Sequence, residues 1–71
     1  MILVEQLLKV VPELHPVRYI DMEDDENIWQ GTAEYTPSEL FDCVIIKVEC
    51  ETNIIPHDTY TTQRAVMKIF I

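Results

Sequence analysis

Two short segments alternate between apolar and polar residues, and this pattern constrains the fold more than any other feature of the chain. Residues 43–51 read C-V-I-I-K-V-E-C-E, and every second residue from Val44 to Cys50 is apolar. Residues 65–71 read A-V-M-K-I-F-I, with an apolar face that ends at Ile71. A period of two is typical of strands half buried in a sheet with one face in water. We therefore expect a β-sheet in which Cys50 is buried as a small hydrophobe.

A β-hairpin is expected earlier in the chain. Residues 17–22 and 28–35 are rich in β-branched and aromatic residues, which favours strands. The connection, residues 23–27, has a length that is ordinary for a hairpin, and its Asp and Asn residues suit turns. Gly31 indicates a bulge or a close approach of the backbone. Residues 52–64 are polar and are expected to form a loop.

Helical patterns occur at two places. Residues 2–11 have apolar side chains at helical spacing and stop at Pro12, which predicts an amphipathic helix packed on the sheet. Its expected apolar face consists of Leu3, Leu7, Val10, Val11 and Leu14. Residues 36–39, Thr-Pro-Ser-Glu, match a capping box and predict a helical turn through about residue 42. The predicted class is α+β: an N-terminal helix on a small antiparallel sheet of about four strands, with a short helical turn between strands two and three.

The length of the chain limits both its core and its chemistry. Seventy-one residues form one domain, residues 1–71, with a core that supplies roughly 3–5 kcal/mol of stability. At 48% apolar residues the chain is expected to fold rather than to stay disordered. Cys43 and Cys50 lie on one predicted strand, about 20 Å apart, which is too far for a disulfide. Two free thiols and an apolar start without a basic leader fit the cytoplasm.

All of the excess charge lies in the middle of the chain. Residues 19–46 carry eight acidic residues and no basic one, whereas the other residues carry five of each sign. The formal net charge of -8 therefore belongs to this segment. Such a field disfavours anionic membranes and direct binding of nucleic acid through phosphates. Five carboxylates are crowded into six positions: Asp21, Glu23, Asp24, Asp25 and Glu26.

Metal and catalytic motifs do not fit this sequence. A calcium loop that begins at Asp21 would need Gly at its sixth position and Glu at its twelfth, where Glu26 and Thr32 stand. The two Cys and two His residues have no zinc-ligand spacing. His57 and Asp58 are adjacent in a loop, whereas catalytic groups converge from separate elements. We expect no metal, no cofactor and no enzymatic activity.

The acidic segment then predicts a surface that binds protein. Its carboxylates would steer a basic partner surface, such as that of a nuclease or another nucleic-acid-binding protein, and Trp29 or Tyr35 would be the desolvated anchor. The predicted contact residues are Asp21, Glu23, Asp24, Asp25, Glu26, Trp29, Glu34 and Tyr35.

In size, acidity and lack of catalytic motifs, the whole chain resembles the short accessory proteins of bacteriophages and mobile elements, including the anti-CRISPR proteins. The resemblance is one of overall character and carries over no functional residue. It implies an inhibitor that occupies the basic groove of a nucleic-acid-binding enzyme as a nucleic-acid mimic.

A second function is compatible with the same features. In this alternative the chain is a small structural domain, and the acidic hairpin serves only solubility. Val66 and Phe70 lie on the nominally solvent-facing side of the last strand, which suggests coverage by the helix or a homodimer contact.

Overall fold

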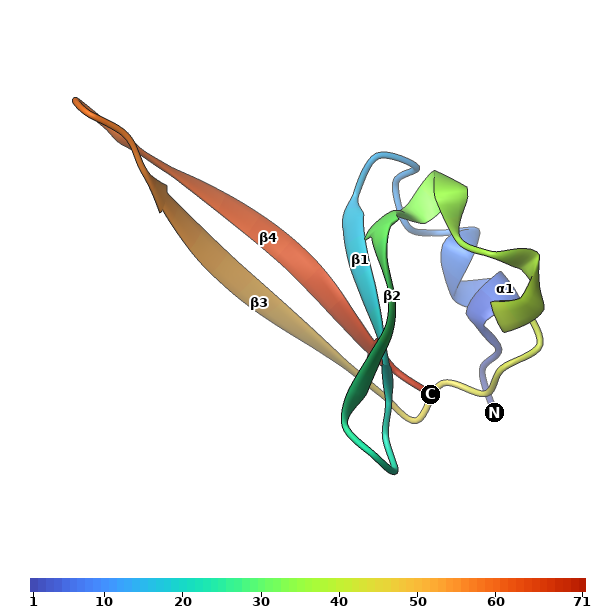
Figure 1. The fold of residues 1–71 in the computed structure, drawn as a ribbon. Helices are drawn as coiled ribbons and strands as arrows, with labels where there is room; N and C mark the ends of the chain where they lie inside the picture. Colours follow the sequence, from blue (N-terminus) through green and yellow to red (C-terminus); the bar gives the residue numbers. More distant parts are fainter.

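The chain folds into one four-stranded sheet with a short helix and two 3₁₀ turns on one side of it (Figure 1). The structure is a computed structural model that describes the backbone of residues 1–71 and the side chains of all of them except residue 53. The elements in chain order are α1 (Val4–Leu8), β1 (Pro16–Asp21), β2 (Glu26–Thr32), η1 (Ala33–Tyr35), η2 (Ser38–Leu40), β3 (Lys47–Pro56) and β4 (Thr61–Phe70).

The sheet has the strand order β2-β1-β4-β3 and is mixed, so the prediction of an antiparallel sheet is wrong. β1 with β2 and β3 with β4 form antiparallel hairpins, but β1 and β4 run parallel, with Val17 beside Met67 and Ile20 beside Phe70. Residues 33–46 cross from one end of the sheet to the other. As a result β3 begins level with the end of β1, with β4 between them, and β4 runs in the same direction as β1. The broader expectation, a small α+β fold, agrees with the structure.

The N-terminal helix is shorter than predicted. α1 contains five residues, whereas the apolar spacing indicated residues 2–11. The β-branched residues Val4 and Val10 lower the helix propensity, and the chain before the helix is held by another segment. Leu3 forms a β-bridge with Val44, and the N–H of Val4 donates to the Cys43 carbonyl at 3.0 Å. This backbone pairing fixes the start of the helix.

The buried face of the N-terminal segment also differs from the predicted one. Val4 and Val11 are buried in the core, and Leu7 packs beside them. Val10 and Leu14, which were expected on the apolar face, are 78% and 73% exposed. Because the helix ends at Leu8, helical spacing no longer determines which of the later side chains face the sheet.

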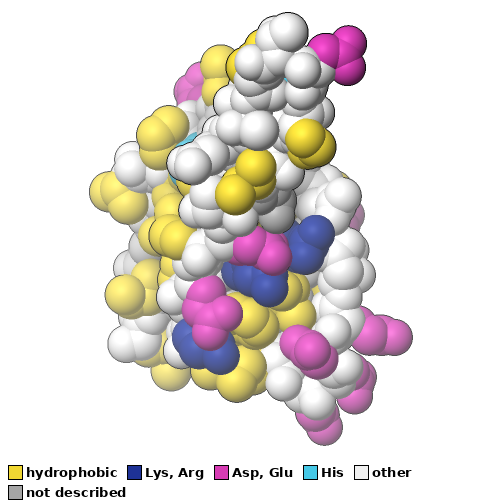
Figure 2. Space-filling view, turned by 90° about the vertical axis from the view of Figure 1, so that its left-hand side faces the viewer, with side chains coloured by type: hydrophobic (Ala, Val, Ile, Leu, Met, Phe, Trp, Pro, Cys, Tyr) yellow, Lys and Arg dark blue, Asp and Glu magenta, His cyan; other side chains and the backbone are white. Residues whose placement is uncertain are grey.

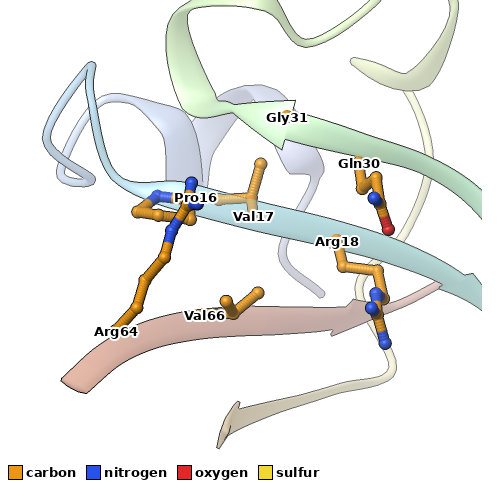
Figure 3. A pocket seen from close by; sticks show the side chains of 7 residues that line it. All are labelled: Pro16, Val17, Arg18, Gln30, Gly31, Arg64 and Val66. Carbon is orange, nitrogen blue, oxygen red and sulfur yellow. The ribbon is translucent and has the colours of Figure 1, made fainter. Parts of the chain in front are cut away.

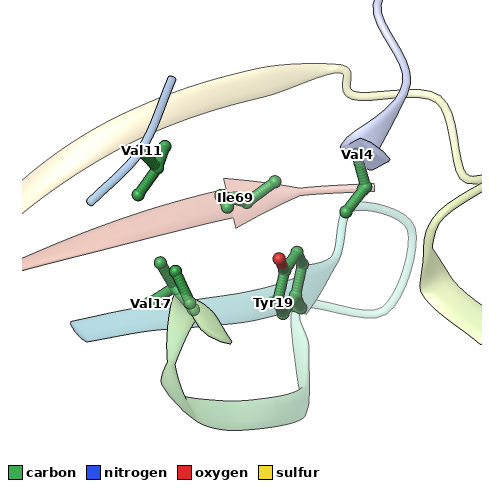
Figure 4. Packing of buried hydrophobic residues seen from close by; sticks show 6 residues of the cluster. Val4, Val11, Val17, Tyr19 and Ile69 are labelled. Carbon is green, nitrogen blue, oxygen red and sulfur yellow. The ribbon is translucent and has the colours of Figure 1, made fainter. Parts of the chain in front are cut away.

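The core lies between this N-terminal segment and the inner face of the sheet. Tyr19 and Val17 on β1, Ile69 on β4 and Val4 on α1 are almost fully buried and point toward one another (Figure 4). The partly buried side chains around them are Leu7, Leu8, Trp29, Leu40, Phe41, Cys43, Ile45, Met67 and Ile71. The two central strands therefore supply most of the fully buried side chains.

Thr36 does not cap a helix, so the predicted capping box is wrong. Its Oγ1 donates to the carbonyl of Ala33 at 2.9 Å and lies 3.0 Å from the Tyr19 hydroxyl. Since the single Thr36 hydroxyl proton is given to Ala33, Tyr19 is the donor to Thr36. Pro37 precedes η2, which has no side-chain cap. The helical turn expected after strand two is present as η1 and η2, and Thr36 ties η1 to the core.

The buried Tyr19 hydroxyl makes the fold less stable at alkaline pH. Burial raises the pKa of Tyr19 above its usual value, and the hydrogen bond with Thr36 partly opposes this shift. The unfolded chain ionises near the usual value of about 10, so stability is lost as the pH rises above it. We expect Tyr19→Phe to cost about 1 kcal/mol at neutral pH. We also expect it to remove part of the alkaline loss.

Urea unfolding at pH 7 and at a pH above 10 measures both effects. Tyr60→Phe is the control, because Tyr60 is 60% exposed and its hydroxyl is outside the core. If the stability of the wild type and of Tyr19→Phe changed equally with pH, ionisation of Tyr19 would not be a cause of the alkaline loss.

Residues 52–64 form strands rather than the predicted polar loop. β4 pairs with β1 only from Met67 onward, so residues 51–66 project from the body as a two-stranded arm (Figure 1). The molecule measures 44 × 26 × 18 Å as a result. At the tip, the N–H of His57 donates to the Tyr60 carbonyl at 2.8 Å, and the two rings stack with centroids 4.4 Å apart. The overlooked signal is the density of β-branched residues: Thr52, Ile54, Ile55, Thr59, Thr61 and Thr62.

β3 also begins later than predicted and exposes more of its side chains. The sequence placed the strand at residues 43–51, but β3 begins at Lys47, because the N-terminus pairs with residues 41–45. Cys50 is exposed, so its predicted burial is wrong. The side chain lies where the sheet leaves the body, beyond the reach of the N-terminal segment.

Phe70 is not available as the subunit contact suggested by the sequence. It is 7% exposed within the chain, and the Lys47 ammonium lies 4.4 Å from the centroid of its ring. Val66 is half-buried. The cover comes from a cross-strand neighbour, since Lys47 and Phe70 are paired in register.

Gly31 allows Trp29 to lie flat over the strand. A Cβ at Gly31 would lie 2.7 Å from one atom of the Trp29 ring and 2.9 Å from another. This close approach is what the glycine within the predicted strand indicated. The Trp29 ring lies 6.0 Å from that of Tyr19, so its position matters to the core.

We expect Gly31→Ala to displace the Trp29 ring and to destabilise the fold by about 1–3 kcal/mol through overpacking. Urea unfolding followed by tryptophan fluorescence measures the loss, with a change in the native emission maximum. Gln30→Ala, at the exposed neighbouring position, is the control and should leave both quantities nearly unchanged. If the two variants changed the stability and the emission maximum equally, the position of the Trp29 ring would not depend on the absence of a Cβ at Gly31.

Candidate functional site

The acidic turn, residues 21–26, connects β1 to β2 and has a defined backbone. The N–H of Asp25 donates to the carbonyl of Asp21 at 2.7 Å, and the N–H of Glu23 donates to the Asp21 carboxylate at 2.9 Å. Asp25 has a φ of 56°, a left-handed conformation that Asp tolerates better than most residues. Asp21 and Glu26 are paired across the hairpin. Local turn chemistry therefore accounts for Asp21 and Asp25 but not for the other carboxylates.

The charge of this turn is not neutralised within the described part of the chain. Glu23, Asp24, Asp25 and Glu26 are exposed, and no ion pair involves any carboxylate of residues 21–26. Crowded carboxylates repel one another, so a site of this kind favours a cation or a basic surface.

Three of the five basic side chains are paired on the outer face of the sheet instead. Arg18 and Lys68 each lie 3.9 Å from Glu51, and Lys47 lies 3.1 Å from Glu49. Figure 2 shows basic side chains beside acidic ones near the middle of this face, and acidic side chains without a basic neighbour at its lower edge. These three basic side chains on β1, β3 and β4 are therefore paired with Glu49 and Glu51 and not with the carboxylates of the turn.

The structure divides the predicted contact residues into two groups. Asp21, Glu23, Asp24, Asp25 and Glu26 lie together at the turn. Glu34 and Tyr35 lie in η1, beyond the opposite end of β2, where Thr32 pairs with Pro16. At about 3.3 Å per residue, the length of β2 separates the two groups by roughly 20 Å. A partner would have to cover the whole hairpin to contact both.

Of the two predicted aromatic anchors, only Tyr35 is freely accessible. Tyr35 is 73% exposed, whereas Trp29 is half-buried and packs against the core beside Tyr19. Trp29 therefore has a structural role in this fold. The alternation of β2 explains it, because Trp29 faces inward while its neighbours Ile28 and Gln30 face outward.

Two exposed apolar side chains that sequence reasoning missed accompany the acidic turn. Met22, between Asp21 and Glu23, is 42% exposed, and Ile28, two residues after Glu26, is 45% exposed. The sequence prediction assigned both residues to the strands of the hairpin and not to the contact surface. Apolar groups beside charges supply the desolvated contact that a charged loop alone lacks.

A shallow hollow lies where the arm leaves the body. Its volume is about 230 Å³, and Arg18 on β1 and Arg64 on β4 border it (Figure 3). Val66 lies between the two arginines in this view, and Gln30 and Pro16 complete the rim. The Nε of Arg18 is buried without a hydrogen-bond acceptor among the described side chains. The hollow is smaller than the roughly 300–1,000 Å³ of typical ligand pockets.

No group of three or more His, Cys, Asp or Glu side chains among the described residues is arranged to hold a metal ion. No helix in the described structure has both the length and the apolar character needed to cross a membrane.

Comparison with family models, with curated proteins and with solved structures gives no match for this chain.

Proposed function

We propose that the chain is a non-enzymatic protein-binding module whose acidic turn docks on a basic surface of another protein. The observation that carries the proposal is the ordered turn at residues 21–26, which presents carboxylates without an ion-pair partner among the described side chains. Such a field accelerates association with a surface of opposite charge. Met22 and Ile28 supply the apolar contacts beside it.

Proteins that bind DNA or RNA are the partner class that this surface fits best. Their grooves are lined by Lys and Arg, which neutralise phosphates spaced a few ångströms apart. Crowded carboxylates on a projecting turn offer a similar density of negative charge. The proposed role is that of an inhibitor that occupies such a groove, a host nuclease being one example, as a nucleic-acid mimic.

Affinity capture from a nuclease-treated bacterial lysate, eluted with a salt series, tests this function. We expect a nucleic-acid-binding protein that elutes at moderate salt and is displaced by added duplex DNA. Retention that is insensitive to both salt and DNA would rule out the acidic turn as the contact. Nuclease treatment removes captured nucleic acid as the bridge between the two proteins.

A structural, self-associating domain is the second candidate function, in which the acidic turn serves solubility. The observation that favours it is the exposed outer edge of β3, with Val48, Ile54 and Ile55 accessible along it. Capture of no partner, together with a salt-insensitive oligomer, would support this candidate over the first.

A further inference from the structure

We propose that β3 pairs edge to edge with β3 of a second copy, so that two arms form one continuous antiparallel sheet. This interface deepens the second candidate function, self-association, on which it rests, and it is independent of the docking function proposed for the acidic turn. The notable feature is that β3 is a ten-residue edge strand. In the described structure its outer edge pairs with no other segment. The backbone groups along this edge form a template for another strand.

Few of the devices that usually block such pairing occur within the edge. Charged side chains, proline and bulges protect natural edge strands, but Lys47 and Pro56 stand only at the two ends of β3, and Glu49 and Glu51 are the charged residues between them. The pairing of β3 with β4 is regular throughout, without a bulge. The register of β1 with β4 begins at Met67, so the arm forms no strand pairing with β1, and a two-stranded hairpin alone is marginally stable in water. Addition of strands from a second copy would stabilise it.

Charge selects the register of this pairing. When a two-fold axis relates the two antiparallel strands, each residue stays on the same face of the combined sheet in both copies. Residues that face each other across the pair are therefore both even-numbered or both odd-numbered. If the two-fold axis passed through residue 49, 50 or 51, Glu49 or Glu51 of one copy would face Glu49 or Glu51 of the other, which is destabilising. Earlier centres run into residues 44–46, where Leu3 already bridges Val44. Centring on Thr52 avoids both problems and retains a longer paired segment than later centres.

The Thr52 register also matches the apolar side chains. It places Cys50 of each copy opposite Ile54 of the other, Val48 opposite Pro56, and Thr52 opposite its own copy. All of these residues share the face opposite to Glu49 and Glu51. Ile54 is 64% exposed and Val48 is 42% exposed in the single chain, so pairing would remove apolar area from water.

The distribution of charge favours a second copy as the occupant. The excess charge lies in residues 19–46, whereas residues 47–71 carry three basic and three acidic side chains and sum to zero. In the antiparallel arrangement, each body lies beyond the tip of the other arm. The bodies are then about 30 Å apart along the strands, several times the screening length of about 8 Å at physiological salt. Two acidic chains can therefore associate through their neutral arms.

Sedimentation over a concentration series, at low and high salt, tests the interface. We expect a concentration-dependent dimer of the 8.3 kDa chain at both salt levels. Ile54→Lys should abolish the dimer, whereas Gln63→Lys should not. Gln63 is the matched control, because it is exposed and faces Ile54 across the same hairpin but lies on β4. Circular dichroism should show both variants folded.

A single-cysteine crosslinking series tests the register. In a background with Cys43 and Cys50 replaced by serine, Thr52→Cys should link to its copy with a short bifunctional thiol reagent. Thr59→Cys, at the tip of the arm, should not, because the two tips point in opposite directions. The proposal would be overturned if the chain stayed a monomer at all concentrations or formed an open-ended polymer. It would also be overturned if Gln63→Lys abolished the dimer as effectively as Ile54→Lys, or if crosslinking occurred at residue 59 and not at residue 52.

Discussion

Replacement of Ile69 by alanine is expected to leave a large share of the chain unfolded at room temperature. Ile69 is fully buried on the central strand β4 and contacts the cluster that includes Val4 and Tyr19. Truncation of a buried isoleucine costs about 2–5 kcal/mol, through lost transfer energy and the cavity that remains. A single core in a chain of this length supplies roughly 3–5 kcal/mol in total. The two ranges overlap, so one side chain decides whether the fold persists.

Urea unfolding at a fixed protein concentration measures this loss, because self-association would shift the midpoint. Ile46→Ala is the matched control: the same truncation at a side chain that is 60% exposed. It should change the stability by about 0.5 kcal/mol or less. If both variants lost the same stability, the core would not lie between the N-terminal segment and the inner face of the sheet.

Neutralisation of the acidic turn is expected to slow association with the captured partner by about 10- to 1,000-fold, most strongly at low salt. The variant carries Asp24→Asn, Asp25→Asn and Glu26→Gln. Asn also tolerates the left-handed conformation at position 25, so the turn should keep its shape. Stability should stay within about 0.5 kcal/mol of the wild type or rise, since crowded like charges are removed. Stopped-flow association and urea unfolding measure the two quantities.

The matched control is a second neutralised variant: Glu34→Gln, Glu39→Gln and Asp42→Asn. These side chains are exposed and belong to the same acidic segment, but they lie outside the turn. The change in net charge is the same. If both variants slowed association equally, the partner would respond to the overall charge rather than to the turn, and the proposed contact would be wrong.

The sequence predicted best the features that depend on near neighbours. Alternation located the inward-facing residues of the last strand, with Ile69 fully buried and Met67 beside it. The first hairpin and its acidic connection are also present, because turn chemistry is local, but its second strand is Glu26–Thr32 and not residues 28–35, and residues 33–35 form η1. The capping box failed for a different reason: Thr36 matched the motif, but the buried Tyr19 hydroxyl and the Ala33 carbonyl engage its side chain.

Features that depend on distant contacts could not be read from the chain. Alternation predicted that Cys50 is buried and placed Phe70 on the nominally solvent-facing side, yet Cys50 is exposed and Lys47 covers Phe70. The grouping of the predicted contact residues failed in the same way. Tyr35 is near the acidic run in sequence but at the opposite end of the hairpin in space.

The sequence by itself determined that the chain forms strands, that its excess charge lies in residues 19–46, and that a hairpin turn concentrates this charge. These are properties of composition and of local periodicity. Only the tertiary structure decided that β4 lies parallel to β1 and that residues 51–66 form an arm with a free edge. It also decided that, among the described side chains, none forms an ion pair with the acidic turn, while Arg18, Lys47 and Lys68 are paired elsewhere. The physical reason is that strand partners and ion pairs are selected by the burial and charge of segments far apart in the chain, and a local pattern carries no record of which segment that is.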